Sequence, residues 1–251
     1  MDYTSHLLLF LLALIANWFS ALAGGGAGLI QLPLLIFLGL PFPLALATHK
    51  VATVALGLGA TARHLREGHL HWPMLFLIAL AGIPGVIAGV FFILDVNARH
   101  AEIALGCLTL SLALYSWVKP ELGLKPNSKN RHALGFAIGG VVLFVIGFAN
   151  GALSAGSGLF VTLWLVYWFG FDYRTAVAQT LVAVGLGWNA VGAITMGAVA
   201  AVQWSWIPAL LLGSVVGGYL GAHTSIASGN HLIKRLFELI TLFMGLKLLW
   251  G

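Results

Sequence analysis

The sequence predicts an all-α integral membrane protein built from two halves of opposite orientation. Three observations predict this fold: an apolar composition, ten apolar segments of helical length, and a similarity between the two halves. Hydrophobic residues make up 60% of the 251 residues and charged residues only 8%, whereas soluble domains carry about one quarter charged residues. The formal charge of +5 does not require a nucleic-acid partner, because membrane proteins gather Lys and Arg in cytoplasmic loops.

Ten apolar segments divide the chain, five on each side of a polar linker. A helix needs ~20 residues to cross a hydrocarbon core of ~30 Å, and most of the segments approach that length. The second and seventh contain only about a dozen residues, which corresponds to ~18 Å of helix. We expect a first transmembrane repeat over 1–118, a cytoplasmic linker over 119–131 and a second repeat over 132–251. The segments cover 7–22, 29–40, 44–62, 73–94, 101–118, 133–148, 159–170, 176–202, 206–222 and 232–250.

The two halves resemble each other in sequence. Alignment of 26–29 with 156–159 brings each glycine-rich stretch, the short segment after it and the next long segment into register. Later in the same alignment, IPGVIAG at 83–89 corresponds to LGSVVGG at 212–218. A tandem duplication explains these matches, so we expect two repeats of about five helical segments each.

The basic residues predict the orientation of the chain. If the linker is cytoplasmic, nine of the twelve Lys and Arg residues face the cytoplasm and only Arg99 and Lys247 face outward. Each half has five segments, which is an odd number of passes, so the repeats are inverted. With the linker in the cytoplasm, both termini are periplasmic. The nine inward residues are Arg63, Arg66, Lys119, Lys125, Lys129, Arg131, Arg174, Lys234 and Arg235.

Two glycine-rich stretches interrupt the apolar sequence, ALAGGGAGLIQL at 21–32 and ANGALSAGSGLF at 149–160. A helix broken at membrane depth is tolerated where its backbone is buried in protein or lines a wet cavity. A helix that restarts after glycine directs free N–H groups and a positive dipole end into the gap, which favours an anion. The alternative is that the glycines only let helices pack closely. The candidate residues are Gly24, Gly25, Gly26 and Gly28 in the first break and Gly156, Ser157 and Gly158 in the second.

Polar residues near the middle of long segments are further candidates for the binding site. Thr48, His49 and Lys50 lie in the third segment, where a lysine costs about 2.5–3.5 kcal/mol on insertion scales. Lys50 has no obvious carboxylate partner, so a bound substrate anion could supply the opposite charge; alternatively, Lys50 is neutral, snorkels or caps backbone carbonyls. His49 suits a coupling proton or a packed hydrogen-bonding role. The eighth segment adds Gln179, Thr180 and Asn189, which either line the cavity or bond between helices.

Other chemistry is less well supported by the sequence. The histidines in RHLREGHLHW lack the ordered spacing of a metal site, so we expect neither a metal nor a cofactor. An intramembrane enzyme could use Ser157 as nucleophile with His49 or another histidine as base, but the first break has Ala27 at the matching position. An anion channel is the third possibility.

The motifs together resemble the TauE/SafE group of sulfite exporters. They are the break with GGGAG, the ATHK sequence about twenty residues later, Gly-His-x-x-Trp after a basic loop, the second break FANGALSAGSGLF and the later AVAQTL. The resemblance implies a bacterial inner-membrane secondary transporter that moves sulfite or an organosulfonate by alternating access, coupled to protons. It is compatible with a homo-oligomer. Members of the group commonly have a triplet such as T-S-L where this chain has THK. It carries over Gly24, Gly25, Gly26, Gly28, Thr48, His49, Lys50, Gly151, Gly156, Ser157, Gly158, Gln179 and Thr180.

Overall fold

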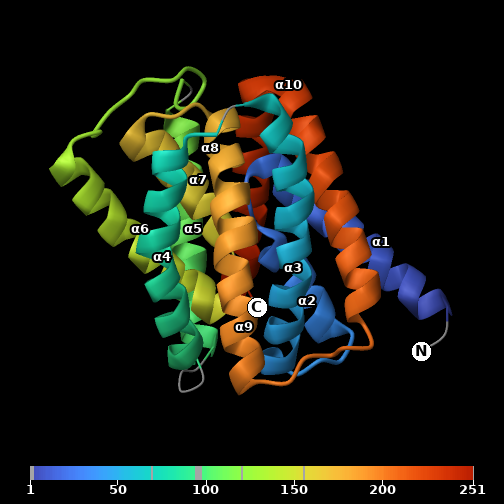
Figure 1. Ribbon diagram of the computed structural model, residues 1–251. Coiled ribbons are helices and arrows are strands. Elements are labelled where there is room, and N and C mark those ends of the chain that lie inside the picture. Colours follow the sequence, from blue (N-terminus) through green and yellow to red (C-terminus); the bar gives the residue numbers. More distant parts are fainter. Residues whose placement is uncertain (1–2, 69, 94–97, 120, 155, 251) are drawn as a thin grey trace.

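The computed structural model describes residues 3–68, 70–93, 98–119, 121–154 and 156–250, and all regular structure in these ranges is helical (Figure 1). The prediction of an all-α membrane protein is confirmed. The first half contains α1 (Tyr3–Ala23), α2 (Ala27–Phe37), α3 (Phe42–His64), η1 (Leu65–Glu67), α4 (Trp72–Ile93) and α5 (Ala98–Val118). The second contains α6 (Ala133–Leu153), α7 (Ser157–Phe169), α8 (Tyr173–Thr180), η2 (Leu181–Trp188), α9 (Asn189–Val199) and α10 (Ile207–Trp250).

The ten predicted segments all correspond to helices. The eighth is one continuous helix made of α8, the π-helix η2 and α9, and the ninth and tenth are the two arms of α10, which bends at Gly229 (φ 74°, ψ 169°). By length and composition, six helices in the described part of the chain could cross a membrane. The two short apolar helices are α2 and α7.

The two short helices each form a hairpin with the long helix before them. Asn17 of α1 donates from Nδ2 to Gln31 Oε1 of α2 over 3.3 Å, so α2 runs back along α1. In the second half, the Trp168 indole N–H near the end of α7 donates to the Gly135 carbonyl near the start of α6 over 3.0 Å. Each hairpin therefore has its glycine break as its tip.

The hairpins enter the bundle from opposite ends. The second arm of α10 runs antiparallel to α5, because Lys234 Nζ bonds the Ser116 carbonyl near the end of α5 and Arg99 at its start bonds the Leu249 carbonyl. The chain therefore ends on the side opposite to the linker. The first arm of α10 lies parallel to α1, with Gly213 and Gly221 against the α1 backbone at Phe10 and Trp18. Thus α1 begins at the end opposite to the linker, whereas α6 begins at the linker end (Figure 1).

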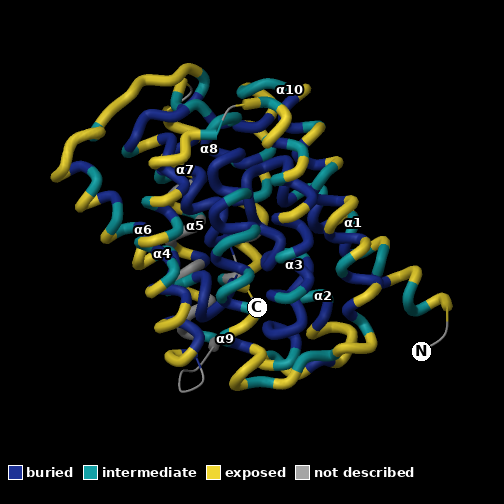
Figure 2. The backbone as a smooth tube through the Cα atoms, viewed as in Figure 1, coloured by how far each residue is buried: buried dark blue, intermediate teal, exposed yellow. Residues whose placement is uncertain are grey.

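Burial follows the position of the hairpin tips. Buried backbone gathers in the middle of the bundle, whereas the linker and the outer helix faces are exposed (Figure 2). Large apolar side chains such as Phe76, Leu80, Val141 and Ile194 are exposed on the outside. An apolar exterior around a buried centre is what a hydrocarbon surrounding requires. The duplication and the division at 119–131 remain predictions.

Candidate functional site

The tips of the two hairpins touch through glycine backbone. A Cβ atom built on Gly25 would lie 2.5 Å from the Cα of Gly158, and one built on Gly158 would lie 2.7 Å from the Cα of Gly25. Gly25 also has φ 141°, in the region that side chains rarely adopt. Glycine is therefore required on both sides of this contact.

The two tips share a backbone conformation at positions that correspond in the alignment. Gly24 (φ 85°) and Ser154 (φ 57°) are left-handed, as are Gly26 (φ 100°) and Gly156 (φ 72°), the N-caps of α2 and α7. Both short helices begin directly after these N-caps. The two halves therefore turn the chain in the same way before each helix restarts.

Each tip is fastened by a polar residue of the helix that precedes it. In the first half, Ser20 Oγ accepts a hydrogen bond from the Ala27 N–H over 3.0 Å. In the second, Asn150 Nδ2 donates to Ser157 Oγ over 2.8 Å. Ser20 and Asn150 correspond in the alignment of the halves, as do Ala27 and Ser157, so the fastening is repeated with different chemistry.

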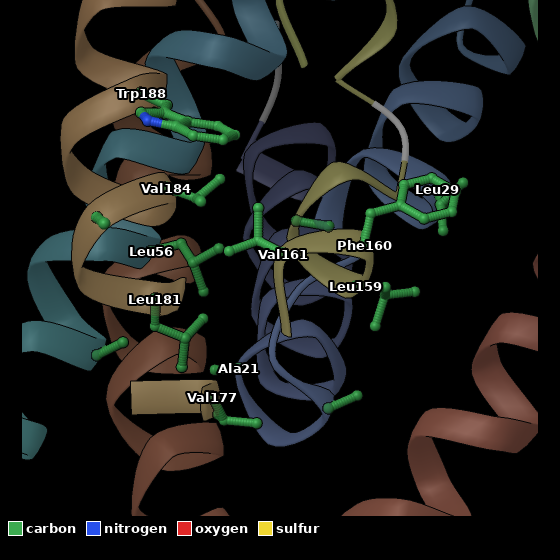
Figure 3. Close-up of a cluster of buried hydrophobic side chains, with 14 of the residues drawn as sticks. Ala21, Leu29, Leu56, Leu159, Phe160, Val161, Val177, Leu181, Val184 and Trp188 are labelled. Carbon is green, nitrogen blue, oxygen red and sulfur yellow. The ribbon is translucent and has the colours of Figure 1, made fainter. Parts of the chain in front are cut away.

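Both helix starts line one buried cavity of about 30 Å³. Eight of the predicted site residues line it: Gly25, Gly26, Gly28, His49, Ser157, Gly158, Thr180 and Asn189. The other lining residues are Ser20, Ala27, Thr53, Leu56, Asn150, Ser154, Leu181, Val184 and Gly185. Figure 3 shows part of the apolar surroundings, a cluster of buried side chains that includes Leu56, Leu181 and Val184. Residues of both breaks thus line the same cavity, and its role as a binding site stays a prediction.

The lining is suited to a small anion. The first N–H groups of any helix have no partner within that helix, and the N-terminus carries about half a positive charge. Because both N-caps are glycine, they offer no side chain to these N–H groups. The remaining polar groups are hydroxyls, amides and one imidazole, so no carboxylate among the lining residues repels an anion.

His49 is the one titratable side chain among the cavity-lining residues. It is 1% exposed, and no described residue bonds its Nδ1 atom. Thr53 lies one turn further along α3 and donates to the His49 carbonyl over 3.1 Å. The same face of α3 thus presents an imidazole and a hydroxyl to the cavity.

Lys50 lies behind the cavity wall rather than in it. Its Nζ donates to the Asn150 carbonyl over 2.7 Å and lies 3.4 Å from Asn150 Oδ1. Asn150 belongs to the last turn of α6, where a cation is favoured by the helix dipole. Lys50 therefore caps a backbone carbonyl, one of the alternatives that the sequence left open. It also bonds the side chain of Asn150, whose amide N–H bonds Ser157.

Four further predicted residues lie outside the cavity lining. The Gly24 carbonyl accepts from Thr162 Oγ1 over 2.8 Å. Thr48 Oγ1 donates to the Leu44 carbonyl and accepts from the Gln203 N–H, so Thr48 fastens the loop before α10. Gly156 forms the N-cap of α7, and Gln179 is fully buried.

The π-helix beside the cavity was not predicted. Thr180 and Asn189 flank η2, and Leu181, Val184 and Gly185 within it line the cavity. π-turns inside α-helices occur frequently at functional sites. Apolar periodicity does not distinguish a π-helix from an α-helix, so the sequence predicts an ordinary helix over this segment.

Ser157 and the histidines do not form a reactive group in the described structure. Ser157 Oγ accepts its hydrogen bond from an amide N–H of Asn150, which cannot take a proton from it. Among the described residues, no three His, Cys, Asp or Glu side chains are placed to hold a metal ion. His69 lies outside the described residues.

Comparison with known proteins assigns the chain to a family. The family described as "Sulfite exporter TauE/SafE" matches residues 9–248. The "Probable membrane transporter protein ORF9" of Sinorhizobium is 28% identical over 251 residues, covering 99% of this chain and 94% of the relative. The "Probable membrane transporter protein YfcA" of Escherichia coli is 27% identical over 244 residues, with coverage of 96% and 88%.

A third relative, "Probable membrane transporter protein" of Haemophilus influenzae, is 26% identical over 243 residues, with coverage of 97% and 94%. No solved structure matches the chain. The three relatives carry the names of transporters and not of enzymes, and the family match extends over nearly the whole sequence. The chain is therefore a membrane transporter, not an enzyme, and it belongs to the sulfite exporter TauE/SafE family.

Proposed function

We propose that the protein is a secondary transporter that binds one small anion in the cavity between the two hairpin tips. One observation carries the proposal: the N-termini of α2 and α7, which belong to hairpins from opposite ends of the bundle, line the same buried cavity. Secondary transporters use broken helices of this kind to bind anions near the middle of the membrane.

The proposed substrate is a small sulfur-containing anion of the sulfite or organosulfonate class. Backbone N–H groups and neutral side-chain donors recognise oxygen atoms that share a negative charge. The family description names sulfite, which makes it the first compound to test. Sulfate, thiosulfate, sulfoacetate and a simple carboxylate complete the set.

We propose alternating access, which the small size of the cavity and the placement of the hairpins support. A cavity of about 10–15 Å³ is needed to hold one water, so a cavity of about 30 Å³ is tight for an oxyanion of four or more heavy atoms. Loading therefore requires the walls to move. Because each hairpin reaches the cavity from its own end, displacement of one tip opens the site toward one side while the other tip still closes it.

Proton coupling is assigned to His49. It is a titratable side chain at the cavity, it is buried, and its Nδ1 has no partner among the described residues. A proton on His49 adds a positive charge next to the proposed anion, so the two would bind together. Anion flux in proteoliposomes should respond to an imposed pH gradient; flux that ignores the gradient would remove the coupling.

Orientation and location complete the proposal. Nine of the twelve basic residues belong to the linker end, which we place in the cytoplasm of a bacterium, with the protein in the inner membrane and both termini in the periplasm.

Thr53→Val tests the binding site. The substitution keeps the shape of the side chain and removes the cavity hydroxyl, whose O–H would turn from the His49 carbonyl to the anion. We therefore expect anion affinity to fall about tenfold, with reduced flux, as for the loss of one hydrogen bond worth about 1.4 kcal/mol. Affinity is read by calorimetry or by ligand-induced thermal stabilisation, and flux by uptake into proteoliposomes.

Thr195→Val is the matched control. Thr195 also bonds the carbonyl four residues earlier in its own helix, yet it lies outside the cavity. Binding and flux should be unchanged in this variant. Equal losses in both variants, or none in Thr53→Val, would place the substrate elsewhere, and flux that does not saturate with concentration would indicate a channel.

A further inference from the structure

A groove and a basic pocket adjoin at the linker end of the molecule, on the outer face of the second hairpin. There α5 and α6 both contact α7, although α5 packs mainly on α10 and α6 mainly on α4. The space between them is an apolar groove of about 460 Å³, whose walls include Val145 of α6 and Leu163 and Trp164 of α7. The groove opens on the outside of the bundle, where Val145 and Tyr167 are exposed, and it shares no lining residue with the transport cavity.

The basic pocket has a volume of about 570 Å³ and is continuous with the groove, because Tyr115 and Tyr167 line both. The two tyrosine rings meet edge to face with centroids 5.5 Å apart. Beyond them, the pocket is lined by Lys119, Lys125 and Lys129 together with one acidic residue, Glu121. The linker is held against the end of α7 by a hydrogen bond from the Asn127 N–H to the Gly170 carbonyl, so the lysines lie over the end of the groove.

The boundary between groove and pocket has the composition of a membrane interface. Trp164 and Trp168 stack with centroids 5.1 Å apart, next to Tyr167. Tyr and Trp gather at the depth of lipid headgroups because one end of each ring is apolar and the other polar. The Trp164 indole N–H has no acceptor among the described residues. A buried donor beside an apolar groove favours a ligand that carries oxygen atoms.

We propose that the groove and pocket together bind one anionic phospholipid, with an acyl chain along the groove and the phosphate among the lysines. The pocket holds three lysines against one glutamate, an excess of positive charge that favours a net negative headgroup over a zwitterionic one. The apolar groove that continues from the pocket favours a lipid over a free anion, which would gain nothing from it. The bound lipid lies against α6 and α7, the hairpin whose tip forms one wall of the transport cavity.

The test is native mass spectrometry of the full chain, released from detergent that contains equal amounts of phosphatidylglycerol and phosphatidylcholine. Wild-type protein should retain one phosphatidylglycerol in preference to phosphatidylcholine. Lys125→Gln/Lys129→Gln should reduce that preference roughly tenfold or more, because each basic residue near the headgroup strengthens the binding of an anionic lipid by roughly fivefold. The control Arg66→Gln/Lys247→Gln also removes two positive charges from exposed positions outside the pocket and should behave as wild type.

A second pair of variants tests the groove. Val145→Trp fills the groove while the lysines remain, and should reduce lipid retention; Val141→Trp, one turn away at an exposed position outside the groove, should not. The proposal is overturned if the lysine variants keep the preference, or if the charge control loses it equally. It is also overturned if Val145→Trp has no effect while inorganic phosphate displaces the lipid, since the pocket would then be a site for a free anion.

Discussion

The two hairpin tips have the same backbone shape but different side chains. In the first tip, Ser20 accepts from a helix N–H and the position that begins α2 is Ala27. In the second, Asn150 bonds the Ser157 hydroxyl and is itself held by Lys50. Both tips bring a helix N-terminus to the cavity, but among the described residues the second tip alone has a cation behind it, Lys50. The backbone thus provides the two sides of the proposed anion site, and the side chains make them different.

The long helices that follow the two hairpins also differ from each other. The first hairpin is followed by α3, which is helical without interruption, whereas the second is followed by a helix with the π-segment η2. They cross where Gly57 of α3 meets the backbone at Gly185 of η2. The specific contacts to a single ligand between these unlike walls can come mostly from one side, and the second half offers more side chains for them.

The contact between the tips should produce the largest effect. Gly25→Ala combines a forbidden φ with overlap on the Gly158 backbone, so we expect a loss of several kcal/mol and failure to fold. Gly158→Ala introduces only the overlap, so we expect a loss of stability of about 1–3 kcal/mol. Gly39→Ala introduces only the unfavourable φ, because no atom lies within 4 Å of its Cβ position, and should lose about 1–2 kcal/mol.

Thermal unfolding in detergent ranks these three variants. The order of stability should be wild type, Gly39→Ala, Gly158→Ala and Gly25→Ala. A Gly25→Ala variant no less stable than Gly39→Ala would show that the tips do not need their backbone contact.

The cation behind the second tip should have the next largest effect. Lys50→Gln removes a charge-assisted bond to Asn150, so we expect at least a tenfold loss of anion affinity, with Asn150→Ala causing a similar loss. If Lys50 acts through Asn150, the double variant should lose little more than either single variant in a double-mutant cycle.

Lys247→Gln, at an exposed position near the C-terminus, is the control for net charge and should bind as wild type. Additive losses from Lys50→Gln and Asn150→Ala would contradict the positioning role. They would instead favour direct interaction of Lys50 with the anion, the alternative that the sequence left open.

The hydroxyl of the second tip should have the smallest effect. Ser157→Ala makes α7 begin as α2 does, so we expect anion affinity to fall about three- to tenfold while transport continues. Calorimetry and proteoliposome flux measure the two quantities. Complete loss of transport with full binding would mean that Ser157 takes part in a step other than binding.

Much of the fold follows from the sequence because membrane helices are marked by long apolar runs. The ten segments, the two short helices and the two glycine breaks all lie where they were predicted, and eight predicted residues line the cavity. Ser20 and Thr53 were missed, although each leaves a signal: Ser20 corresponds to Asn150, and Thr53 follows His49 by one helical turn. The direction in which the Lys50 side chain points could not be predicted, because its partner, Asn150, lies 100 residues away in the chain.

The sequence by itself determined that this chain is a helical membrane protein whose apolar segments are broken twice by glycine. Those features depend on local composition, since lipid excludes unpaired backbone wherever it occurs. Only the tertiary structure decided that the two breaks touch, that Lys50 caps Asn150 outside the cavity, and that a π-turn lies beside the site. These features depend on how close two distant backbones approach, and that distance is set by the packing of the whole bundle.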